Sequence, residues 1–505
     1  MKEKDWLKKV ISKAGNIIFV TPEMKSFKSK VGGLGDVAEE LGKELAGMGL
    51  NITFVTLLYK RTRHSEQNTD LVDLNYKEIP IEDTGKEIEV EVAEEKVRAK
   101  IKKSKIGKAN VIFLENEKYA DIVYGGDLLR QAIFIGRGTL EVLKALNIKP
   151  SIIHLHDALT SLVCFVRIDK RYSEDPFFDK VKLTYTVHNA GKAYQEIFDG
   201  ARFNEFGVDK IHWFGVSWYE NIDLMYAGLF HSQICNTVSN DYAEFLKTGG
   251  EGFAEVFKKK NIFGIVNGSD FDYWKIKRPK EKAKLDLIKQ VKEKTGAVLD
   301  ENKFIITLPR RVAFQKGLDI VIEIMKDIVK ERKEGGVGAQ FILLGKAHEQ
   351  DDLGRRWEDA FRKLDEEFKN KFVFINEFNQ PFAKLMYEGG DLLLYPSKPN
   401  KEPCGTGYML AMANITPSLG TSTGGLAELI EEFNPKTGKG NGFLISKEEY
   451  SSKAFLKKMK MISNIFYDKP KIWKKLMKNV FETDVDMKKV AKEYIVKMYQ
   501  PLLKS

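Results

Sequence analysis

Short apolar runs, rich in β-branched residues, alternate with longer amphipathic stretches along most of the chain. Runs of this length predict buried strands, and the amphipathic stretches between them predict helices. The predicted strands of the first half are Asn16–Thr21, Asn51–Leu57, Asn110–Leu114, Ile152–His156, Leu183–His188 and Gln233–Val238. Those of the second half are Lys303–Leu308, Gln340–Leu344, Phe372–Asn376, Leu392–Tyr395, Ile415–Leu419 and Gly442–Ile445. This alternation is typical of an α/β protein with parallel sheets.

Two such series predict two doubly wound, Rossmann-like domains, spanning residues 1–262 and 263–480. Alternating polar and apolar residues predict a hairpin insertion near 76–114 in the first domain. A C-terminal amphipathic helix, within 481–505, is expected to cross back to the first domain. Because ligands of open α/β sheets bind beyond the C-terminal ends of the strands, we expect the domains to face each other across a deep cleft.

Composition and charge narrow the class of protein without naming a partner. The chain has 505 residues, of which 43% are hydrophobic and 30% charged, as in a globular protein of more than one domain. The net charge of +10 could indicate a polyanionic partner, but basic residues are interspersed with acidic ones and form no block with aromatic residues. This pattern favours a solvated surface over nucleic-acid binding.

Three cysteines, Cys164, Cys235 and Cys404, are far apart and match neither a disulfide framework nor a zinc site. No run approaches the ~18 apolar residues of a membrane span, and the first apolar run is too short for a secretory signal. We therefore expect a cytoplasmic protein without a membrane partner. No feature of the sequence bears on its oligomeric state.

The segment Lys30–Val37 places a cation beside Gly32 and Gly33, between a predicted strand and a predicted helix, Val37–Met48. Glycines allow a ligand to approach the backbone, and the N-terminus of a helix offers N–H groups to an anion. The spacing matches neither the dinucleotide-binding G-x-G-x-x-G nor the P-loop. The turn is therefore either an anion site or an ordinary strand–helix connection.

Two histidine clusters follow other predicted strands of the first domain. His154 and His156 share a strand face and could bind a metal, but no third ligand accompanies them, so a hydrogen-bonded strand end is the competing interpretation. Asp157 comes directly after them. His188 ends the next strand before a glycine turn, where it could serve either the fold or a binding site.

The predicted second domain carries three comparable clusters. Arg310, Arg311 and Lys316 follow its first strand and could either clamp a diphosphate or lie in solvent. Glu402 lies in a turn that contains Pro and Gly, and Thr423–Leu426 forms a second glycine turn that could bind an anion or cap a helix. Together with Lys30–Val37, these clusters favour a phosphate-bearing ligand held between the domains.

Taken in order, these motifs resemble the bacterial and plant-type glycogen/starch synthases, which are retaining glucosyltransferases with a GT-B fold. The matching segments are Lys30–Leu34, His156-Asp157, Thr186–Asn189, Thr237–Ser239, Gly264–Gly268, Arg311–Asp319, Glu402–Gly405 and Thr423–Leu426. The resemblance implies transfer of glucose from a nucleotide-glucose, ADP-glucose or UDP-glucose, to the non-reducing end of an α-1,4-glucan. It implies retention of configuration, and neither a metal nor another cofactor.

In the second domain the resemblance assigns Glu402 to the donor sugar, and Arg311 and Lys316 to the leaving diphosphate. It places the remaining second-domain matches among the nucleotide-sugar-binding residues, with Phe378 against the base as a looser alignment: Cys404, Gly405, Thr423, Gly424, Gly425 and Phe378.

In the first domain the resemblance assigns Lys30, Gly32 and Gly33 to the donor diphosphate. It places His188 near the reacting sugar and makes Asp157 a donor-sugar or acceptor contact.

The chain departs from the family at Ala158, where a Trp is usual, and at Thr406-Gly407, where the usual order is Leu-Thr. These departures leave the choice of acceptor and base open. The alternatives are another retaining GT-B transferase with a different donor or a small acceptor, a glucan phosphorylase, and a non-catalytic glucan- or nucleotide-binding protein. A phosphorylase needs a pyridoxal phosphate lysine, for which no convincing segment is present, and a binding protein could dispense with the Glu402, Lys316 and Arg311 that this chain retains.

Overall fold

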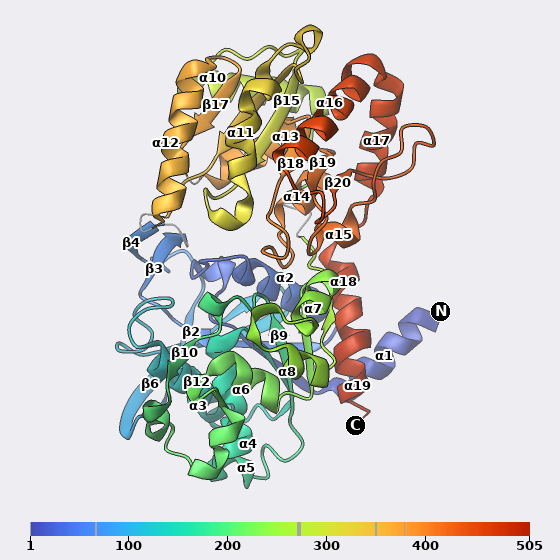
Figure 1. The fold of residues 1–505 in the computed structure, drawn as a ribbon. Coiled ribbons are helices and arrows are strands. Elements are labelled where there is room, and N and C mark those ends of the chain that lie inside the picture. Colours follow the sequence, from blue (N-terminus) through green and yellow to red (C-terminus); the bar gives the residue numbers. More distant parts are fainter. Residues whose placement is uncertain (1, 66–67, 270–273, 349–350, 378, 505) are drawn as a thin grey trace. The chain divides into compact units, whose positions relative to one another are not determined.

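The computed structural model describes residues 2–65, 68–269, 274–348, 351–377 and 379–504, which form two compact units (Figure 1). The first unit comprises Met1–Glu66, Asp70–Ile265 and Met487–Ser505. The second comprises Val266–Asp486 with Gln67–Thr69. Each unit is built around its own mostly or wholly parallel sheet, which confirms the predicted α/β class with two Rossmann-like domains.

The first unit contains a nine-stranded sheet with the order β14-β13-β9-β8-β1-β2-β7-β6-β5. The bounds of these strands are β1 Asn16–Val20, β2 Asn51–Leu57, β5 Glu82–Val92, β6 Glu95–Ile106, β7 Ala109–Glu115, β8 Pro150–His156, β9 Lys182–Val187, β13 Ile234–Thr237 and β14 Phe263–Gly264. Strands β14 to β7 run parallel and are buried on both faces, so they read as continuous apolar runs in the sequence. Two short pairings stand apart from this sheet: β3 Arg61–Ser65 with β4 Asn68–Asp73, and the three-stranded group β10 Ile197–Asp199, β12 Asn221–Asp223 and β11 Ser217–Trp218.

Helices cover both faces of this sheet and divide its core into two apolar clusters. The α-helices of the unit are α1 Lys2–Ala14, α2 Leu34–Gly47, α3 Leu128–Ala145, α4 Phe165–Ile168, α5 Lys170–Ser173, α6 Leu224–His231, α7 Asn240–Lys247, α8 Ala254–Lys259, α18 Met487–Tyr494 and α19 Gln500–Leu502. The short 3-10 helices are η1 Lys25–Phe27, η2 Ala158–Cys164, η3 Lys192–Tyr194, η4 Gly200–Phe206, η5 Lys210–Gly215 and η6 Gly250–Gly252. Buried residues of α2 and α18 share one cluster, and those of α3, η2 and α6 share the other.

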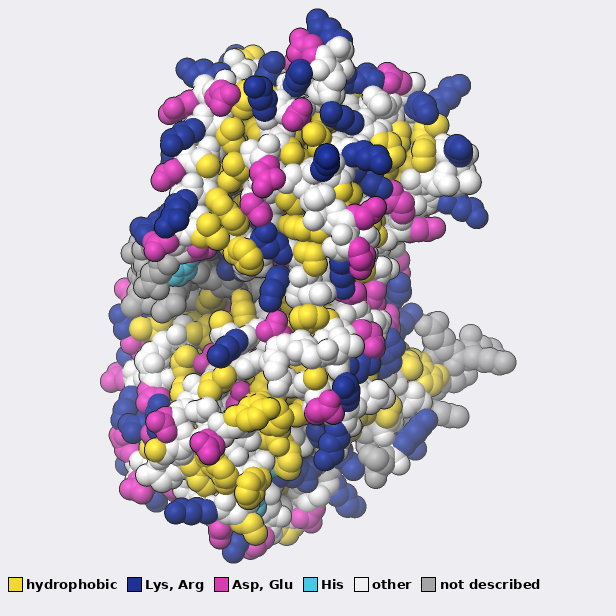
Figure 2. Space-filling model, viewed as in Figure 1, with side chains coloured by type: hydrophobic (Ala, Val, Ile, Leu, Met, Phe, Trp, Pro, Cys, Tyr) yellow, Lys and Arg dark blue, Asp and Glu magenta, His cyan; other side chains and the backbone are white. Residues whose placement is uncertain are grey.

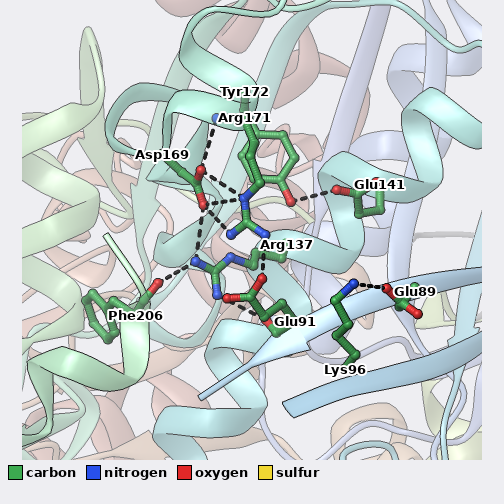
Figure 3. Close-up of polar contacts among 9 residues, drawn as sticks. All are labelled: Glu89, Glu91, Lys96, Arg137, Glu141, Asp169, Arg171, Tyr172 and Phe206. Atoms are coloured by element: carbon green, nitrogen blue, oxygen red, sulfur yellow. Dashed lines mark hydrogen bonds and ion pairs between the residues drawn. The ribbon is translucent and has the colours of Figure 1, made fainter. Parts of the chain in front are cut away.

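The antiparallel strands β5 and β6 extend the sheet beyond β7, and a buried arginine joins this extension to the helices (Figure 3). Arg137 of α3 donates to the carbonyl of Glu91 on β5 (3.0 Å), to the carboxylate of Asp169 (3.1 Å) and to the carbonyl of Phe206. Arg171 bridges Asp169 and the Glu91 carboxylate (2.7 Å). Arg137 and Asp169 are buried and paired, and Arg171 links Asp169 to Glu91 nearer the surface, so this network ties the extension to the helices.

The C-terminal residues of the chain belong to the first unit. After α18 the helix widens into a π-helical turn, Ile495–Tyr499, and ends in α19. The Tyr499 hydroxyl lies 2.8 Å from Nδ1 of His154 on β8, and Tyr494 accepts a hydrogen bond from Asn236 on β13 (3.2 Å). Polar side chains of the central strands thus find their partners on the last helix.

The second unit has a six-stranded parallel sheet with the order β17-β16-β15-β18-β19-β20. Its strands are β15 Phe304–Pro309, β16 Ala339–Leu344, β17 Phe372–Ile375, β18 Leu392–Tyr395, β19 Ser418–Thr421 and β20 Phe443–Ile445. Its helices are α10 Lys280–Thr295, η7 Phe314–Lys316, α11 Leu318–Val329, η8 Arg332–Glu334, α12 Asp352–Glu367, α13 Gln380–Gly389, α14 Gly407–Ala413, α15 Leu426–Leu429, α16 Ser452–Asp468 and α17 Pro470–Glu482.

Eleven of the twelve predicted strands match an observed strand to within two residues at each end. The exception is Ile415–Leu419, because the strand there begins only at Ser418. Ile415 has a positive φ of 59°, and Thr416 donates its hydroxyl to the carbonyl of Tyr387 (2.6 Å). These residues form a turn after α14, which their β-branched side chains do not reveal.

Candidate functional site

A carboxylate and two cations meet at the C-terminal end of the second-unit sheet. Glu402, in the loop after β18, accepts hydrogen bonds from Arg310 (2.7 Å) and from Lys316 (2.6 Å). Arg310 directly follows β15, and Lys316 ends the short helix η7. Since Glu402 is only 8% exposed and Arg310 9%, these are charges enclosed by protein rather than surface ion pairs.

Arg310 is held by further contacts besides its hydrogen bond to Glu402. It also donates to the hydroxyl of Ser397 (2.8 Å), and its guanidinium lies 3.5 Å from the ring centroid of Tyr395. The resemblance assigns Arg311 and Lys316 to the leaving diphosphate; Arg310, the residue before Arg311, hydrogen-bonds Glu402 in the structure. Arg311 is half-buried and lies close enough to lower the pKa of Glu402 through its charge.

The cations decide the protonation of this cluster. Burial alone would raise the pKa of Glu402, but Lys316 and Arg310 outweigh burial and lower that pKa to about 2. Burial lowers the pKa of Lys316 to about 8, although Glu402 opposes the shift. Near neutral pH the cluster therefore holds an ionised carboxylate under an excess of positive charge.

The glycine turn Thr423–Gly425 packs directly against the loop of Glu402. A Cβ atom at Gly424 would lie 2.3 Å from the Glu402 carbonyl oxygen, and one at Gly425 would lie 2.6 Å from Sγ of Cys404. The positive φ of Gly424, 55°, adds to this requirement for glycine. The two motifs are thus brought together in one unit, and Thr423 accepts a hydrogen bond from the amide of Asn400 (2.9 Å).

Cys404 and Gly405 support this loop from within. Burial raises the pKa of the Cys404 thiol to about 12, so it stays protonated beside the Tyr408 hydroxyl at 3.6 Å. Gly405 has a φ of 71°, and a Cβ there would lie 2.3 Å from the Tyr395 hydroxyl. Gly420–Gly424 also spells G-x-S-x-G, but Ser422 does not have the positive φ of a strained nucleophile elbow.

In the first unit, the glycine turn at the start of α2 surrounds a carboxylate of its own chain. The amides of Val31 and Gly32 donate to the same oxygen of Glu23 (2.7 and 2.8 Å), and Tyr124 donates to the other oxygen (2.8 Å). Lys30 pairs with Asp36. The turn therefore holds a carboxyl group, that of Glu23, through its backbone amides.

Gly33 is the residue of this turn whose glycine character has no structural explanation. Its φ is −69°, and a Cβ atom there would have no heavy atom within 4 Å. An alanine would therefore fit both the backbone and the packing. The open space beside Gly33 is consistent with close approach of a ligand to the helix N-terminus.

Asp157 and His188 lie together at the ends of β8 and β9. The Asp157 carboxylate accepts the backbone N–H of His188 (2.7 Å), and Nε2 of His188 lies 3.1 Å from Nδ1 of His156. Asp157 has φ 59° and ψ 175°, a conformation that is rare outside glycine. Strain of this kind, stored at the end of a parallel strand, is typical of a binding or catalytic position.

In the first unit, burial keeps Asp157 and His188 uncharged, whereas in the second unit cations balance the charge of Glu402. Burial raises the pKa of Asp157 to about 8, against the hydrogen bonds from backbone N–H groups. Burial also lowers the pKa of His188 to about 3. At neutral pH this group is thus a protonated acid beside neutral imidazoles, able to hydrogen-bond a neutral polar ligand.

The predicted residues therefore fall into one group in each unit. Asp157, His188 and the Lys30–Gly33 turn lie at strand ends of the first unit, and Lys316, Glu402 and the Thr423–Gly425 turn lie at those of the second. Phe378 lies outside the described residues. Sequence reasoning missed Glu23, Tyr124 and the role of Arg310; the one available signal was that Glu23 and Arg310, like the predicted residues, follow a strand closely.

Two features of the described residues bear on metal-dependent and membrane-bound functions. No group of three or more His, Cys, Asp or Glu side chains among them is arranged to hold a metal ion, and His154 is instead hydrogen-bonded to Thr186 (2.7 Å) and Tyr499. None of the described helices combines the length and apolar character needed to cross a membrane.

Comparisons with known proteins define the class and then the family. Residues 16–259 match the starch synthase catalytic domain, and residues 290–475 match the glycosyl transferases group 1. The structure is similar to the catalytic domain of starch synthase IV from Arabidopsis thaliana, solved with ADP and acarbose, with a TM-score of 0.82 at 22% identity. That match covers 97% of this chain and 100% of the solved chain. The fold is therefore that of a GT-B glycosyltransferase.

Curated relatives resolve the family. The glycogen synthase of Thermotoga maritima is 31% identical over 500 residues, covering 95% of this chain and 97% of that protein. The glycogen synthase of Fervidobacterium nodosum is 32% identical over 511 residues, covering 96% and 98%. The chain belongs to the glycogen synthase family of glucosyltransferases, which confirms the resemblance seen in the sequence.

Proposed function

We propose that the protein transfers glucose from a nucleotide-glucose to the non-reducing end of an α-1,4-glucan, with retention of configuration and without a metal. The observation that carries this proposal is the enclosed cluster of Glu402, Lys316 and Arg310. A binding protein would gain little from a desolvated carboxylate under an excess of positive charge. A transferase gains from it because negative charge grows on the leaving diphosphate in the transition state.

The second-unit residues are assigned to the donor. Lys316 and Arg311 would neutralise the leaving diphosphate, with the Thr423–Gly425 turn as a second phosphate contact. Glu402, kept ionised by its cations, would orient the hydroxyls of the glucosyl group and stabilise positive character at the anomeric carbon. Arg310, itself anchored to the Ser397 hydroxyl, would act through Glu402 by holding its carboxylate beside Lys316.

The first-unit residues are assigned to the sugar and to a further phosphate contact. His188 and Asp157 are neutral near pH 7 and would hydrogen-bond sugar hydroxyls, which carry no charge. The turn with Lys30, Gly32 and Gly33 would meet the donor diphosphate, in competition with Glu23 for its amides. Since this turn already holds the Glu23 carboxyl group, the donor diphosphate would have to displace that group to bind there.

The donor base remains to be assigned by experiment. The solved starch synthase holds ADP, which makes ADP-glucose the first donor to test and UDP-glucose the comparison. Purified protein is incubated with each labelled donor and a glycogen primer, with and without EDTA. We expect labelled glucose to be incorporated into glycogen equally with and without EDTA. An α-1,4-specific exo-hydrolase should release the incorporated label.

Glu402→Gln is the impaired control for this assay, and Lys363→Ala, on the exposed face of α12, is the matched active one. Incorporation with neither donor would contradict the proposal. Transfer to a small acceptor but not to glycogen would point to another retaining GT-B enzyme.

A further inference from the structure

The exposed hydrophobic side chains of the protein are concentrated in one stretch of the first unit. Half of the large hydrophobic side chains that are exposed among the described residues lie between residues 194 and 230. In Figure 2, hydrophobic side chains gather on the face where Figure 1 labels α6 and β12. Apolar side chains that are exposed together in one patch often mark an interaction surface, whereas singly scattered ones do not.

Four rings in this stretch form a continuous row. Tyr219 contacts Trp218 (ring centroids 5.0 Å apart), Trp218 contacts Tyr226 (5.1 Å), and Tyr226 contacts Phe230 (5.7 Å). The two ends of the row are open, since Tyr219 is 80% exposed and Phe230 47%. The middle of the row rests on the buried ring of Phe253, at 5.3 Å from Trp218 and 6.5 Å from Tyr226, so the row is rigid.

The backbone at one end of the row is not explained by folding. Tyr219 and Glu220 form the turn between β11 and β12, and both have positive φ, 47° and 64°. Two-residue hairpin turns with positive φ at both positions favour Asn and Gly, so Tyr and Glu there cost stability. A contact with a ligand would explain why a strained, exposed tyrosine is kept at the tip of this hairpin.

The charges around the row favour a neutral ligand. Residues 216–230 contain no Lys or Arg, and of their two acids Glu220 is exposed whereas Asp223 is buried at the start of α6. Lys260, which reaches the far end, donates to the carbonyls of Phe230 (2.8 Å) and Ser232 (2.9 Å). Single-stranded nucleic acids also stack on aromatic rows, but they need a cationic groove beside the rings.

A sugar chain fits these features. The C–H face of a glucose ring packs on an aromatic ring, while its hydroxyls can reach groups such as Glu220 and Asn221 beside Tyr219. The row also belongs to the same structural piece as His188. The segment from His188 runs into β10, and the carbonyls of Gln195 and Glu196 accept the amides of Met225 (3.1 Å) and Leu224 (3.2 Å) at the start of α6.

We propose that the row formed by Trp218, Tyr219, Tyr226 and Phe230 binds a segment of α-glucan outside the catalytic residues. The choice of an α-glucan as ligand rests on the proposed function. A polymer held at two places on one protein stays near the catalytic residues after each transfer, because the second contact is intramolecular. The row would therefore lower the KM for glycogen without changing the turnover of a short acceptor.

The test measures glycogen binding without any donor. Wild-type protein and the variants Tyr219→Asn, Phe230→Ala and their double combination are run in native gels with and without glycogen. Since asparagine is favoured at positive φ, Tyr219→Asn relieves the turn and cannot lose binding through misfolding there. Phe481→Ala, at a 50% exposed phenylalanine of the second unit, is the matched control.

We expect the double variant to bind glycogen about tenfold more weakly than wild type, the effect of losing two ring contacts. Its KM for glycogen should rise equally, while kcat with a saturating short maltooligosaccharide is unchanged. Unaltered retardation of the double variant, or a wild-type protein that glycogen does not retard, would overturn the proposal. Sedimentation that shows a wild-type dimer and a monomeric double variant would overturn it too, because the row would then be a protein interface.

This outcome is separable from that of the proposed function. If transfer to a short acceptor fails while the variants still lose glycogen retardation, the catalytic assignment is wrong and the binding row stands. If transfer succeeds and retardation is unaffected, the catalytic assignment stands and the row does not bind glucan.

Discussion

Asp157 and Glu402 are strand-end carboxylates of the two units, and their pKa values shift in opposite directions. Burial raises the pKa of both groups. At Glu402 the two cations within hydrogen-bond distance reverse that effect and bring the pKa to about 2, whereas the donors to Asp157 among the described residues are the backbone N–H groups of His188 and Asn189, and its pKa reaches about 8. Withdrawal from water therefore does not by itself set the charge of a site; the neighbours do. The two units accordingly offer an ionic group and a neutral one.

The largest expected effect on activity comes from removing Lys316, which helps to keep Glu402 ionised. Lys316→Ala takes away a hydrogen bond and the largest charge effect on Glu402, and in the proposed mechanism it leaves Arg311 as the remaining cation of the pair assigned to the leaving diphosphate. We expect turnover to fall on the order of a hundredfold or more, the usual cost of deleting a stabiliser of transition-state charge. Steady-state kinetics at saturating donor measure this, with Lys363→Ala as control. Near-normal turnover would remove Lys316 from the proposed mechanism.

Glu402→Gln keeps the size of the side chain but removes its charge. Because that charge matters most when the anomeric carbon becomes positive, turnover should fall by on the order of tenfold to a hundredfold while donor affinity changes little. Donor affinity is measured by titration calorimetry and turnover by glucose incorporation. A loss confined to donor affinity would instead support a structural role for this turn residue.

The pH dependence of donor use should follow Lys316. Its pKa of about 8 means that the ammonium is present below pH 8 and is lost as the pH rises through that value. For the free enzyme, kcat/KM for the donor should therefore fall toward tenfold per pH unit above about pH 8. Lys316→Arg, whose side chain stays charged, should lose activity but show no such decline. A wild-type profile that stays flat to pH 10 would contradict the assignment.

The smallest effect is expected at Asp157. Asparagine resembles the protonated acid that Asp157 is near pH 7, so Asp157→Asn should change turnover by less than about threefold there. This is far below the loss at Glu402→Gln and sharpens the contrast between the units. Asp179→Asn, on the exposed surface of the first unit, is the matched control.

The same variant has a predicted effect on stability. The folded protein keeps the Asp157 proton up to about pH 8, while the unfolded chain releases it near pH 4. Stability due to this residue thus falls as the pH rises from 4 to 8, and Asp157→Asn should lose less stability than wild type over that range. Thermal unfolding at pH 5 and pH 8 measures the difference; equal shifts in both proteins would show that Asp157 is not protonated.

The sheets were predictable because their strands are buried on both faces and contain uninterrupted apolar runs, such as Ile17–Val20 and Phe341–Leu344. The short aromatic strands β10, β11 and β12 were not, because two or three residues carry no period. In the candidate site, the strand-end positions of Asp157, His188 and Glu402 could be read from the order of motifs. Which arginine pairs with Glu402 could not be read, since Arg310 and Glu402 are 92 residues apart and adjacent arginines look alike in sequence.

The return of the chain end to the first unit has a consequence for how the protein is made. Tyr494 and Tyr499 supply the hydroxyls for Asn236 and His154, and the helix that carries them completes one core of the first unit. More than two hundred residues lie between β13 and α18 in the sequence. Since a ribosome adds roughly 5–20 residues per second, α18 is made at least about 10 seconds after β13. Throughout that interval the nascent first unit exposes an unfilled apolar face, and a chaperone is the partner that such a face would recruit.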